Sequence, residues 1–211
     1  MKKTEQMEFW KGQFGKEYNE RNSFSQEEWD QFYINNWGVT KIEMNAKCIG
    51  DLPKDIKILE VGANIGMQLA GLQRMGFTNL YGIELQQNAV EVAKQNTKGI
   101  NVIQGSAFDI PFKDGYFDLV FTSGVLIHIS PNDLPNAMDE MYRCSNKYIW
   151  GFEYFAETIT DINYRGNTGF LWKADYAQLF LDRFNDLDLV KKDFYKYTNE
   201  DNVDCMYLLS K

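Results

Sequence analysis

The sequence predicts a single α/β domain with a seven-stranded, mostly parallel sheet, a helical N-terminal extension and an antiparallel C-terminal hairpin. Five short apolar runs after residue 56 are separated by segments long enough for crossover helices, which is typical of a parallel sheet covered on both faces. Two further apolar runs lie close together near the C-terminus, as the strands of a hairpin do. No repeat, low-complexity tract or flexible linker divides the chain, so we expect one domain over residues 1–211.

The N-terminal segment is predicted to be helical, because aromatic residues recur there at roughly helical intervals. Ser25 followed by Glu28 is a capping-box pattern, which predicts a helix from Ser25 to Asn36. The aromatic face of this helix comprises Trp29, Phe32 and Tyr33. Such a stripe is typical of core packing. We expect residues 1–50 to form a helical lid on a core of residues 51–211.

The seven strand candidates are the runs KILEVG, NLYGIE, INVIQG, FDLVFTSGVLIHI, KYIWGFE, DLVKKDFYKY and VDCMYLLS. One crossover helix is predicted to begin at Ser130 and Pro131, a capping residue and a first-turn proline. Its buried stripe is expected to comprise Leu134, Met138, Met141 and Tyr142.

The composition excludes several classes of protein. The chain has 211 residues, 44% of them hydrophobic, and at this length folding buries about 70% of the extended chain's surface without disulfide or metal support. Because 22 basic residues face 30 acidic ones, a net charge of −8 disfavours nucleic acid. Three dispersed cysteines and one histidine favour reduced thiols in the cytoplasm and no metal site. No apolar run suits a signal peptide or a membrane span, so we expect no membrane partner.

The most informative stretch is ILEVGANIGM, at residues 58–67, where a strand ends in a glycine-containing turn that opens a helix. Glycines at 62 and 66 permit tight turning, and the free amides of the following helix favour an electronegative ligand group. The pattern predicts a nucleotide-like ligand. The dinucleotide fingerprint G-x-G-x-x-G fits poorly, because Asn64 stands two positions after Gly62 and Met67 five.

Glu84 ends the next strand candidate, 22 positions after Gly62. A carboxylate about 20 residues beyond such a loop is placed to accept both hydroxyls of a ribose. Glu84 therefore favours an adenosyl cofactor. The dinucleotide alternative shares this feature, so Glu84 by itself does not specify methyl transfer.

The same loop resembles acid-x-Gly-x-Gly-x-Gly, the first motif of the class I S-adenosylmethionine-dependent methyltransferases. The matching residues are Glu60, Gly62, Asn64 and Gly66. Asparagine replaces the middle glycine, and it is among the few residues that tolerate a positive φ. The resemblance implies a Rossmann-like methyltransferase fold with S-adenosyl-L-methionine as cofactor.

Residues 105–111, GSAFDIP, with the following FKDGYFDLVF, resemble the blocks of this superfamily that place the adenine and begin the fourth strand. The resemblance implies cofactor contacts from Ser106, Ala107 and, at the end of the strand, Ser123. Many relatives have aspartate where this chain has Ser106, so Ser106 or a backbone carbonyl must accept from the adenine amino group. Phe108 is placed to stack on the ring or to pack in the core.

His128 follows the fourth strand, at the sheet edge where ligands bind in open α/β folds. An imidazole with a pKa near ~6.5 is suited to accept a proton from an acceptor hydroxyl. His128 is therefore the first candidate for a general base and Glu153 the second. A histidine in this place can also simply hydrogen-bond a loop.

Taken together, EFWKGQFGKEYNERN, GVLIHISP, GFEYFAET and YRGNTGFLWKADYA resemble the small bacterial methylases associated with pseudaminic acid biosynthesis. The resemblance implies a surface-glycan sugar, or a precursor of one, as acceptor. It places Tyr18, Arg21 and Asn22 over the methionine end of the cofactor. The implied acceptor-binding residues are Glu153, Tyr154, Tyr164, Arg165, Lys173 and Asp175. Arg165 and Lys173 would suit an anionic group.

The leading hypothesis is a small-molecule O- or N-methyltransferase acting on a sugar derivative. A second is a methyltransferase acting on a quinone, a lipid or an amino acid. A third is a methyltransferase-like binding subunit without turnover, and a nicotinamide oxidoreductase is a distant fourth. The sequence predicts no oligomeric state.

Overall fold

A computed structural model describes residues 4–211 and contains the predicted seven-stranded sheet. The strands are β1 (Lys57–Val61), β2 (Asn79–Glu84), β3 (Asn101–Gln104), β4 (Phe117–Ser123), β5 (Ser145–Tyr154), β8 (Asp188–Lys196) and β9 (Val203–Ser210). Their order is β3-β2-β1-β4-β5-β9-β8, and the first five are parallel. β9 is antiparallel to both β5 and β8, which confirms the predicted C-terminal hairpin.

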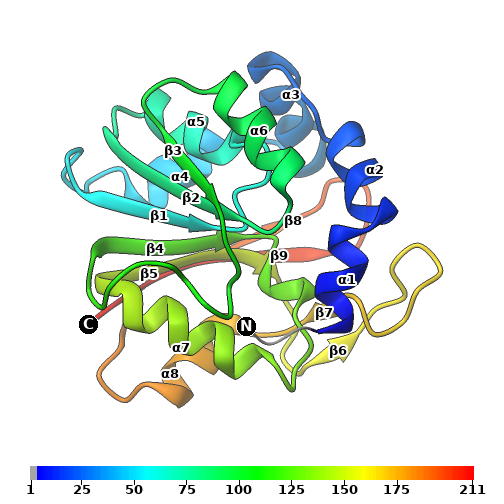
Figure 1. Cartoon of the computed structure of the whole chain (residues 1–211). Helices are drawn as coiled ribbons and strands as arrows, with labels where there is room; N and C mark the ends of the chain where they lie inside the picture. The colour runs from blue at the N-terminus through cyan, green and yellow to red at the C-terminus, as the bar shows by residue number, and fades with distance from the viewer. Residues whose placement is uncertain (1–3) are drawn as a thin grey trace.

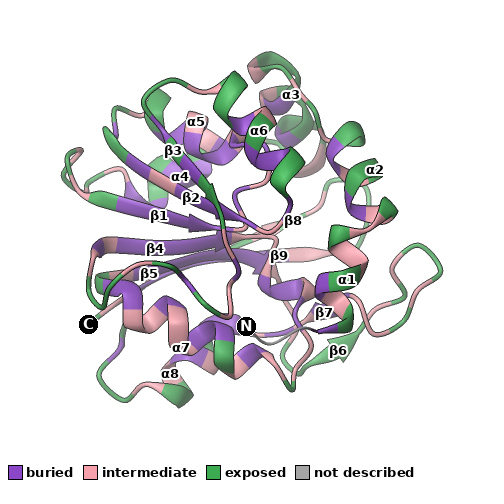
Figure 2. Ribbon diagram, in the orientation of Figure 1, coloured by how far each residue is buried: buried purple, intermediate pink, exposed green. Residues whose placement is uncertain are grey.

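Helices cover both faces of this sheet (Figure 1). They are α1 (Glu5–Lys11), α2 (Gln13–Arg21), α3 (Gln26–Trp37), α4 (Lys41–Ile49), α5 (Met67–Arg74), α6 (Gln87–Asn96), α7 (Leu134–Cys144) and α8 (Tyr176–Arg183). One core cluster packs helices α3, α4, α5 and α6 on one face of the sheet, and a second packs α7 and α8 on the other face. The central strands β1, β4, β5 and β9 are mostly buried (Figure 2), because both of their faces lie under helices. The two edge strands, β3 and β8, are largely exposed or half-buried.

The predicted helix at residues 25–36 is present as α3 and is set by its cap. Ser25 accepts the amide of Glu28, while the Glu28 carboxylate accepts the Ser25 amide at 2.7 Å. Trp29 and Tyr33 are buried as predicted, but Phe32 is 38% exposed. Phe32 lies one position off the buried i, i+4 pair and instead borders a cavity described below.

α7 begins later than predicted, at Leu134 rather than Ser130. The Ser130 hydroxyl donates to Asp133 Oδ2 at 3.0 Å, and this contact closes a turn before the helix. Asp133 occupies the N-cap position, and Pro135 falls in the first turn. The preceding apolar run is also divided: β4 ends at Ser123, Gly124 adopts φ +67°, and a 3₁₀ turn η1 (Leu126–His128) follows.

The segment between β5 and α8 carries a small ladder that the sequence analysis did not predict, β6 (Thr160–Asp161) with β7 (Trp172–Lys173). α1 packs against this insert. Gln6 Nε2 donates to the Gly169 carbonyl at 3.1 Å, and the rings of Phe9 and Phe170 lie 4.3 Å apart. These contacts bring the N-terminal helices to the sheet edge where β1, β2, β4 and β5 end (Figure 1).

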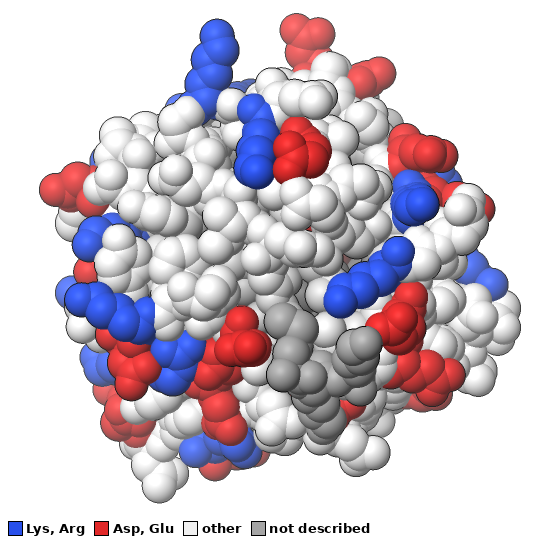
Figure 3. All heavy atoms as spheres, viewed as in Figure 1, with Lys and Arg blue, Asp and Glu red and all other residues white. Residues whose placement is uncertain are grey.

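Figure 3 shows acidic and basic side chains interspersed around the margin of one face, with a largely uncharged centre. Among the described residues, Arg74 pairs with Asp30 at 2.7 Å and Arg183 pairs with Asp139 at 2.6 Å. Within residues 4–211, no helix combines the length and the apolar character needed to cross a bilayer.

Candidate functional site

Two adjoining cavities open where the parallel strands end. One, of about 180 Å³, lies between the loops after β1, β2 and β3 and helix α1. The other, of about 450 Å³, lies between α3, the end of β5 and the β8–β9 connection. Both are lined by Tyr18, Gly62, Asn64, Ser123, Gly124 and His128. The shared residues make the two cavities parts of one cleft, with the glycine loop and η1 at the junction.

The glycine loop has the backbone that the sequence predicted. Gly62 adopts φ +79°, Asn64 φ +47° and Gly66 φ +83°, so asparagine does tolerate the left-handed conformation here. α5 begins directly after Gly66 with no side chain capping its first amides. Free amides at the start of a helix attract an electronegative ligand group.

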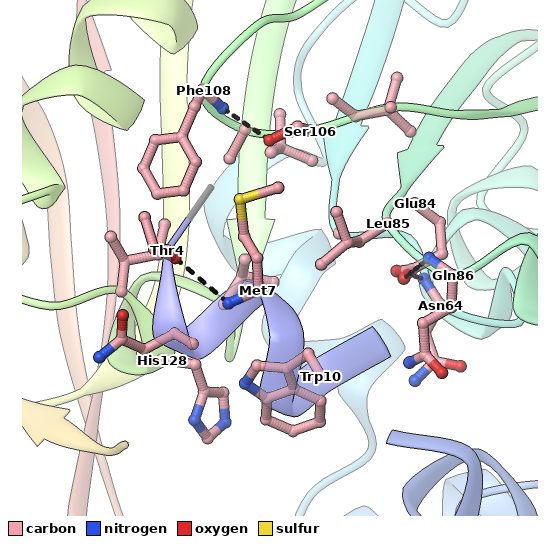
Figure 4. Close-up of a pocket in the computed structure, with 18 of the residues that line it drawn as sticks. Thr4, Met7, Trp10, Asn64, Glu84, Leu85, Gln86, Ser106, Phe108 and His128 are labelled. Carbon is pink, nitrogen blue, oxygen red and sulfur yellow. Dashed lines mark hydrogen bonds between the residues drawn. The ribbon is translucent and has the colours of Figure 1, made fainter. Parts of the chain in front are cut away.

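Glu84 is held rigidly at the rim of the first cavity. Its Oε2 accepts the Asn64 amide at 2.9 Å and its Oε1 accepts the Gln86 amide at 2.8 Å. The carboxylate is 8% exposed, and burial raises its pKa. Each oxygen keeps a lone pair for a ligand hydroxyl. Figure 4 shows Glu84, Gln86 and Asn64 together at one side of the cavity.

The predicted adenine-binding segment lines the same cavity with Ser106, Ala107 and Phe108. Ser106 Oγ accepts the Phe108 amide at 3.2 Å and thereby shapes the turn. The sequence analysis missed the opposite wall, which comes from α1. Figure 4 shows the Met7 side chain rising from α1 between Phe108 and Leu85, and Met7 is only 4% exposed.

His128 lies at the junction of the two cavities. Its Nδ1 is 2.9 Å from the Phe170 carbonyl, which can only accept, so we assign the proton to Nδ1 and a free lone pair to Nε2. Burial lowers the pKa of His128 to about 4. The ring of Trp10, from α1, lies 4.5 Å away. His128 is therefore neutral at neutral pH, with one nitrogen able to accept a proton.

Glu153, the second predicted base, is engaged by the backbone. Its Oε1 accepts the Val125 amide at 3.2 Å and its Oε2 accepts the Ile127 amide at 3.4 Å. The side chain is 1% exposed, and burial raises the pKa of Glu153 to about 7. This carboxylate fixes the 3₁₀ turn that carries His128, so the geometry favours a supporting role.

Of the residues predicted at the methionine end of the cofactor, the structure brings two to the cleft and leaves one outside it. Tyr18 borders both cavities, and burial raises its pKa to about 12, which keeps its hydroxyl protonated. Asn22 lines the second cavity. Arg21 lines neither: it lies 3.8 Å from Glu17 on the same helix.

Some of the predicted acceptor-binding residues line the second cavity, and others do not. Tyr154, Tyr164 and Arg165 line the second cavity, with Arg165 exposed at its mouth in a left-handed turn, φ +52°. Lys173 does not line it and instead donates to Asn202 Oδ1. Asp175 caps α8 and pairs with Lys192 at 2.6 Å, which is a structural role.

A buried charged group beneath the second cavity was missed by the sequence analysis. Lys41 is fully buried, and its Nζ lies 3.2 Å above the centre of the Phe152 ring. Three buried carboxylates, Glu60, Glu153 and Asp204, attract it, while burial lowers the pKa of Lys41 to about 7. A sequence signal exists, because position 41 falls on the buried i, i+3, i+4, i+7 stripe of α4.

Comparisons with known proteins agree with this geometry. Residues 59–147 match the profile of the methyltransferase domain. An uncharacterised methyltransferase of Synechocystis sp. is 32% identical over 87 residues, 41% of this chain and 41% of that protein. Phosphoethanolamine N-methyltransferase of Plasmodium falciparum is 24% identical over 187 residues, 80% of this chain and 67% of that protein. The chain thus spans about two fifths of the first two curated relatives that it matches, 40% and 41% of their lengths.

Among solved structures, magnesium protoporphyrin IX methyltransferase from Synechocystis with bound S-adenosylhomocysteine superposes with a TM-score of 0.69. The two share 12% identity over 97% of each chain, which is a likeness of fold. The methyltransferase-domain match agrees with the predicted enzyme class. Solved neighbours of this fold were crystallised with bound S-adenosylmethionine or S-adenosylhomocysteine. The chain has the Rossmann-like fold of the class I S-adenosylmethionine-dependent methyltransferases, with a methyltransferase-domain match across its central strands.

Proposed function

We propose that this chain is an S-adenosylmethionine-dependent methyltransferase that binds the cofactor in the first cavity and a small acceptor in the second. The observation that carries the proposal is the junction of the two cavities. The glycine loop and His128 line both cavities there, and Glu84 lines the first cavity beside them. A cofactor that spans the junction has its reactive end facing the acceptor cavity.

The residues present fit the cofactor. Glu84 keeps lone pairs for the two ribose hydroxyls, and Ser106, Ala107 and Phe108 border the adenine side. Glu60 lines the second cavity, and its Oε2 has no hydrogen-bond partner within residues 4–211, so it is available to accept from the methionine amino group. Bound S-adenosylmethionine supplies an activated methyl group. The cleft's contribution is to align acceptor and cofactor and to exclude water.

The acceptor cavity supports a small polar substrate rather than a polymer. Its walls are largely aromatic, and such rings pack against the C–H faces of a sugar while their hydroxyls bond to its oxygens. Arg165 at the mouth is placed to hold an acidic group. A surface-glycan sugar precursor, as the resemblance to the pseudaminic acid methylases implies, fits this lining. Three unpaired cysteines fit the expected cytoplasmic setting.

His128 is proposed as the general base for an alcohol acceptor. Its Nε2 lone pair and its place at the junction support this role. An amine acceptor in its neutral form needs no strong base. The relative from Plasmodium is named for methylating an amine, so an N-methyltransferase remains the second candidate.

Calorimetric titration with S-adenosylhomocysteine and a methyl-transfer assay on a panel of amino sugars, sugar acids and small amines test the proposal. We expect binding by the wild-type chain and at least about tenfold weaker binding by Glu84→Gln, since hydrogen bonds to a charged group contribute about 1.5–3 kcal/mol. Glu27→Gln, an exposed change on α3, is the matched control. Absence of binding refutes the proposal. Binding without transfer to any acceptor favours the non-catalytic binding subunit.

A further inference from the structure

We propose that the floor of the second cavity is a binding site for a positively charged ammonium group of the acceptor. The site, here called the ammonium cage, consists of the rings of Tyr33, Trp37, Tyr154 and Tyr197 with the carboxylate of Asp204. The inference rests on the proposed function, because it specifies the substrate class of the same cleft. An amino sugar or another amine-bearing small molecule is the class of acceptor that it selects.

The rings pack against one another as a continuous group that lines the cavity. Trp37 stacks on Tyr33 with ring centres 4.8 Å apart and contacts Tyr197 at 4.6 Å. Tyr154 lies 6.0 Å from Tyr197, edge to face. All four side chains line the second cavity. Because the face of an aromatic ring is negative, several rings around one point attract a cation.

Asp204 supplies the charge that such a cage needs. It lines the cavity from β9, is 2% exposed, and its Oδ2 has no hydrogen-bond partner within residues 4–211. A buried carboxylate oxygen without a partner is costly, so a ligand that donates to it is favoured. Burial raises the pKa of Asp204 to about 7, although Lys41 and the polar groups of Tyr197 and Trp37 act to lower it, and a bound cation would lower that pKa further.

The chain itself neutralises Asp204 only in part. Lys41 is the one buried basic side chain among residues 4–211, and its attraction is shared among Asp204, Glu153 and Glu60. Lys41 reduces the negative charge but does not fill the cavity: its Nζ sits against the rings of Phe152 and Tyr33 and is absent from the lining. Lys173, 5.4 Å from the Tyr154 ring, is occupied by Asn202. The remaining place for a cation is the cavity itself.

The same features argue against other occupants of the floor. A hard metal ion requires several oxygen ligands, and here one carboxylate is surrounded by rings. An anionic group would meet Asp204 and the negative ring faces. An acidic substituent of the acceptor is therefore expected near Arg165 at the mouth, with the ammonium group at the floor.

Two probes of similar size test the charge requirement: 2-aminoethanol, whose amine is protonated at neutral pH and can donate to Asp204, and its neutral carbon analogue propan-1-ol. Each is titrated by calorimetry into the chain saturated with S-adenosylhomocysteine, and again without it. We expect 2-aminoethanol to bind at least about tenfold more tightly, because a desolvated cation–π contact contributes about 2 kcal/mol. Asp204→Asn and Trp37→Leu should each remove most of that preference. Asp188→Asn, at an exposed end of β8, should keep it.

Equal affinities for the two probes, or no binding of either, overturn the cage. The cage is also overturned if Asp204→Asn melts at the wild-type temperature and keeps the preference for the charged probe. If Asp204→Asn unfolds, Tyr197→Leu and Tyr197→Phe decide instead: the leucine variant should lose the preference and the phenylalanine variant keep it. Binding of S-adenosylhomocysteine is measured independently, so failure of the cage and failure of the methyltransferase proposal are distinguished.

Discussion

Substitution of Gly62 by alanine should destabilise the cleft for two separable reasons. The left-handed backbone at φ +79° costs an alanine about 1–2 kcal/mol. An added Cβ would also lie 2.7 Å and 3.0 Å from the two Val125 methyl groups, an overlap that costs about 1–3 kcal/mol. Gly62→Ala should therefore lower the free energy of unfolding by about 2–5 kcal/mol.

The second cause can be removed on its own, because Val125→Ala deletes the methyl groups that the new Cβ would meet. The Val125 amide keeps its bond to Glu153 in this variant, so η1 stays anchored. In a double-mutant cycle, Val125→Ala should therefore recover about 1–3 kcal/mol in the Gly62→Ala background. The loss of stability that remains in the double mutant should be the cost of the left-handed backbone at position 62.

Urea unfolding of the four proteins of the cycle measures both quantities. Gly66→Ala is the matched control, because its φ is +83° but its nearest Cβ contact is 3.2 Å from a Thr97 methyl group. Gly66→Ala should lose the stability that the left-handed backbone costs an alanine, with little further loss from steric overlap. A coupling energy near zero between positions 62 and 125 would refute the close approach of the glycine loop and η1.

The remaining predictions concern His128 and the helix that covers it. His128→Ala should lower kcat by about 10²–10⁴-fold if His128 is the base for an alcohol acceptor, measured as cofactor product released. Because burial lowers the pKa of His128 to about 4 from its usual ~6.5, protonation favours the unfolded chain, and thermal melts should show stability falling as pH drops from about 6.5 toward 4. Trp10→Ala should weaken S-adenosylhomocysteine binding by up to about tenfold, because α1 closes the cleft through its contact with the His128 ring.

Each of these predictions has a contrary result. A wild-type kcat in His128→Ala across pH would remove the base hypothesis. His128→Gln should flatten the loss of stability at low pH, and an unchanged slope would place the titration elsewhere. Unaltered binding by Trp10→Ala would mean that α1 packs beside the cleft without acting as a lid. Phe184→Ala, at the end of α8 and outside both cavities, provides a control for loss of an aromatic ring.

The parallel sheet with its C-terminal hairpin and the glycine loop were predictable because they depend on local signals. Apolar runs with crossover spacing specify a parallel sheet, and positive φ at residues 62 and 66 leaves few residue types that fit. The caps of α3 were predictable for the same reason, since Ser25 and Glu28 are three residues apart. These features need no knowledge of distant contacts.

The parts that the sequence analysis missed depend on contacts between distant segments. Met7 enters the cofactor cavity only because α1 docks on the insert near residue 169. Asp204 reaches the acceptor cavity because β9 pairs with β5 in the register that sets it beside Tyr154. The start of α7 was misplaced because Ser130 bonds the side chain of Asp133 rather than capping a helix of its own.

The measurement that tests the central claim most directly is a crystal structure of the chain grown with S-adenosylhomocysteine. The account predicts the adenosyl ribose within hydrogen-bond distance of both Glu84 oxygens. It also predicts the adenine beside Phe108 and the sulfur at the junction next to His128. Cofactor density elsewhere, or a first cavity still filled by Met7 at saturating ligand, would contradict it.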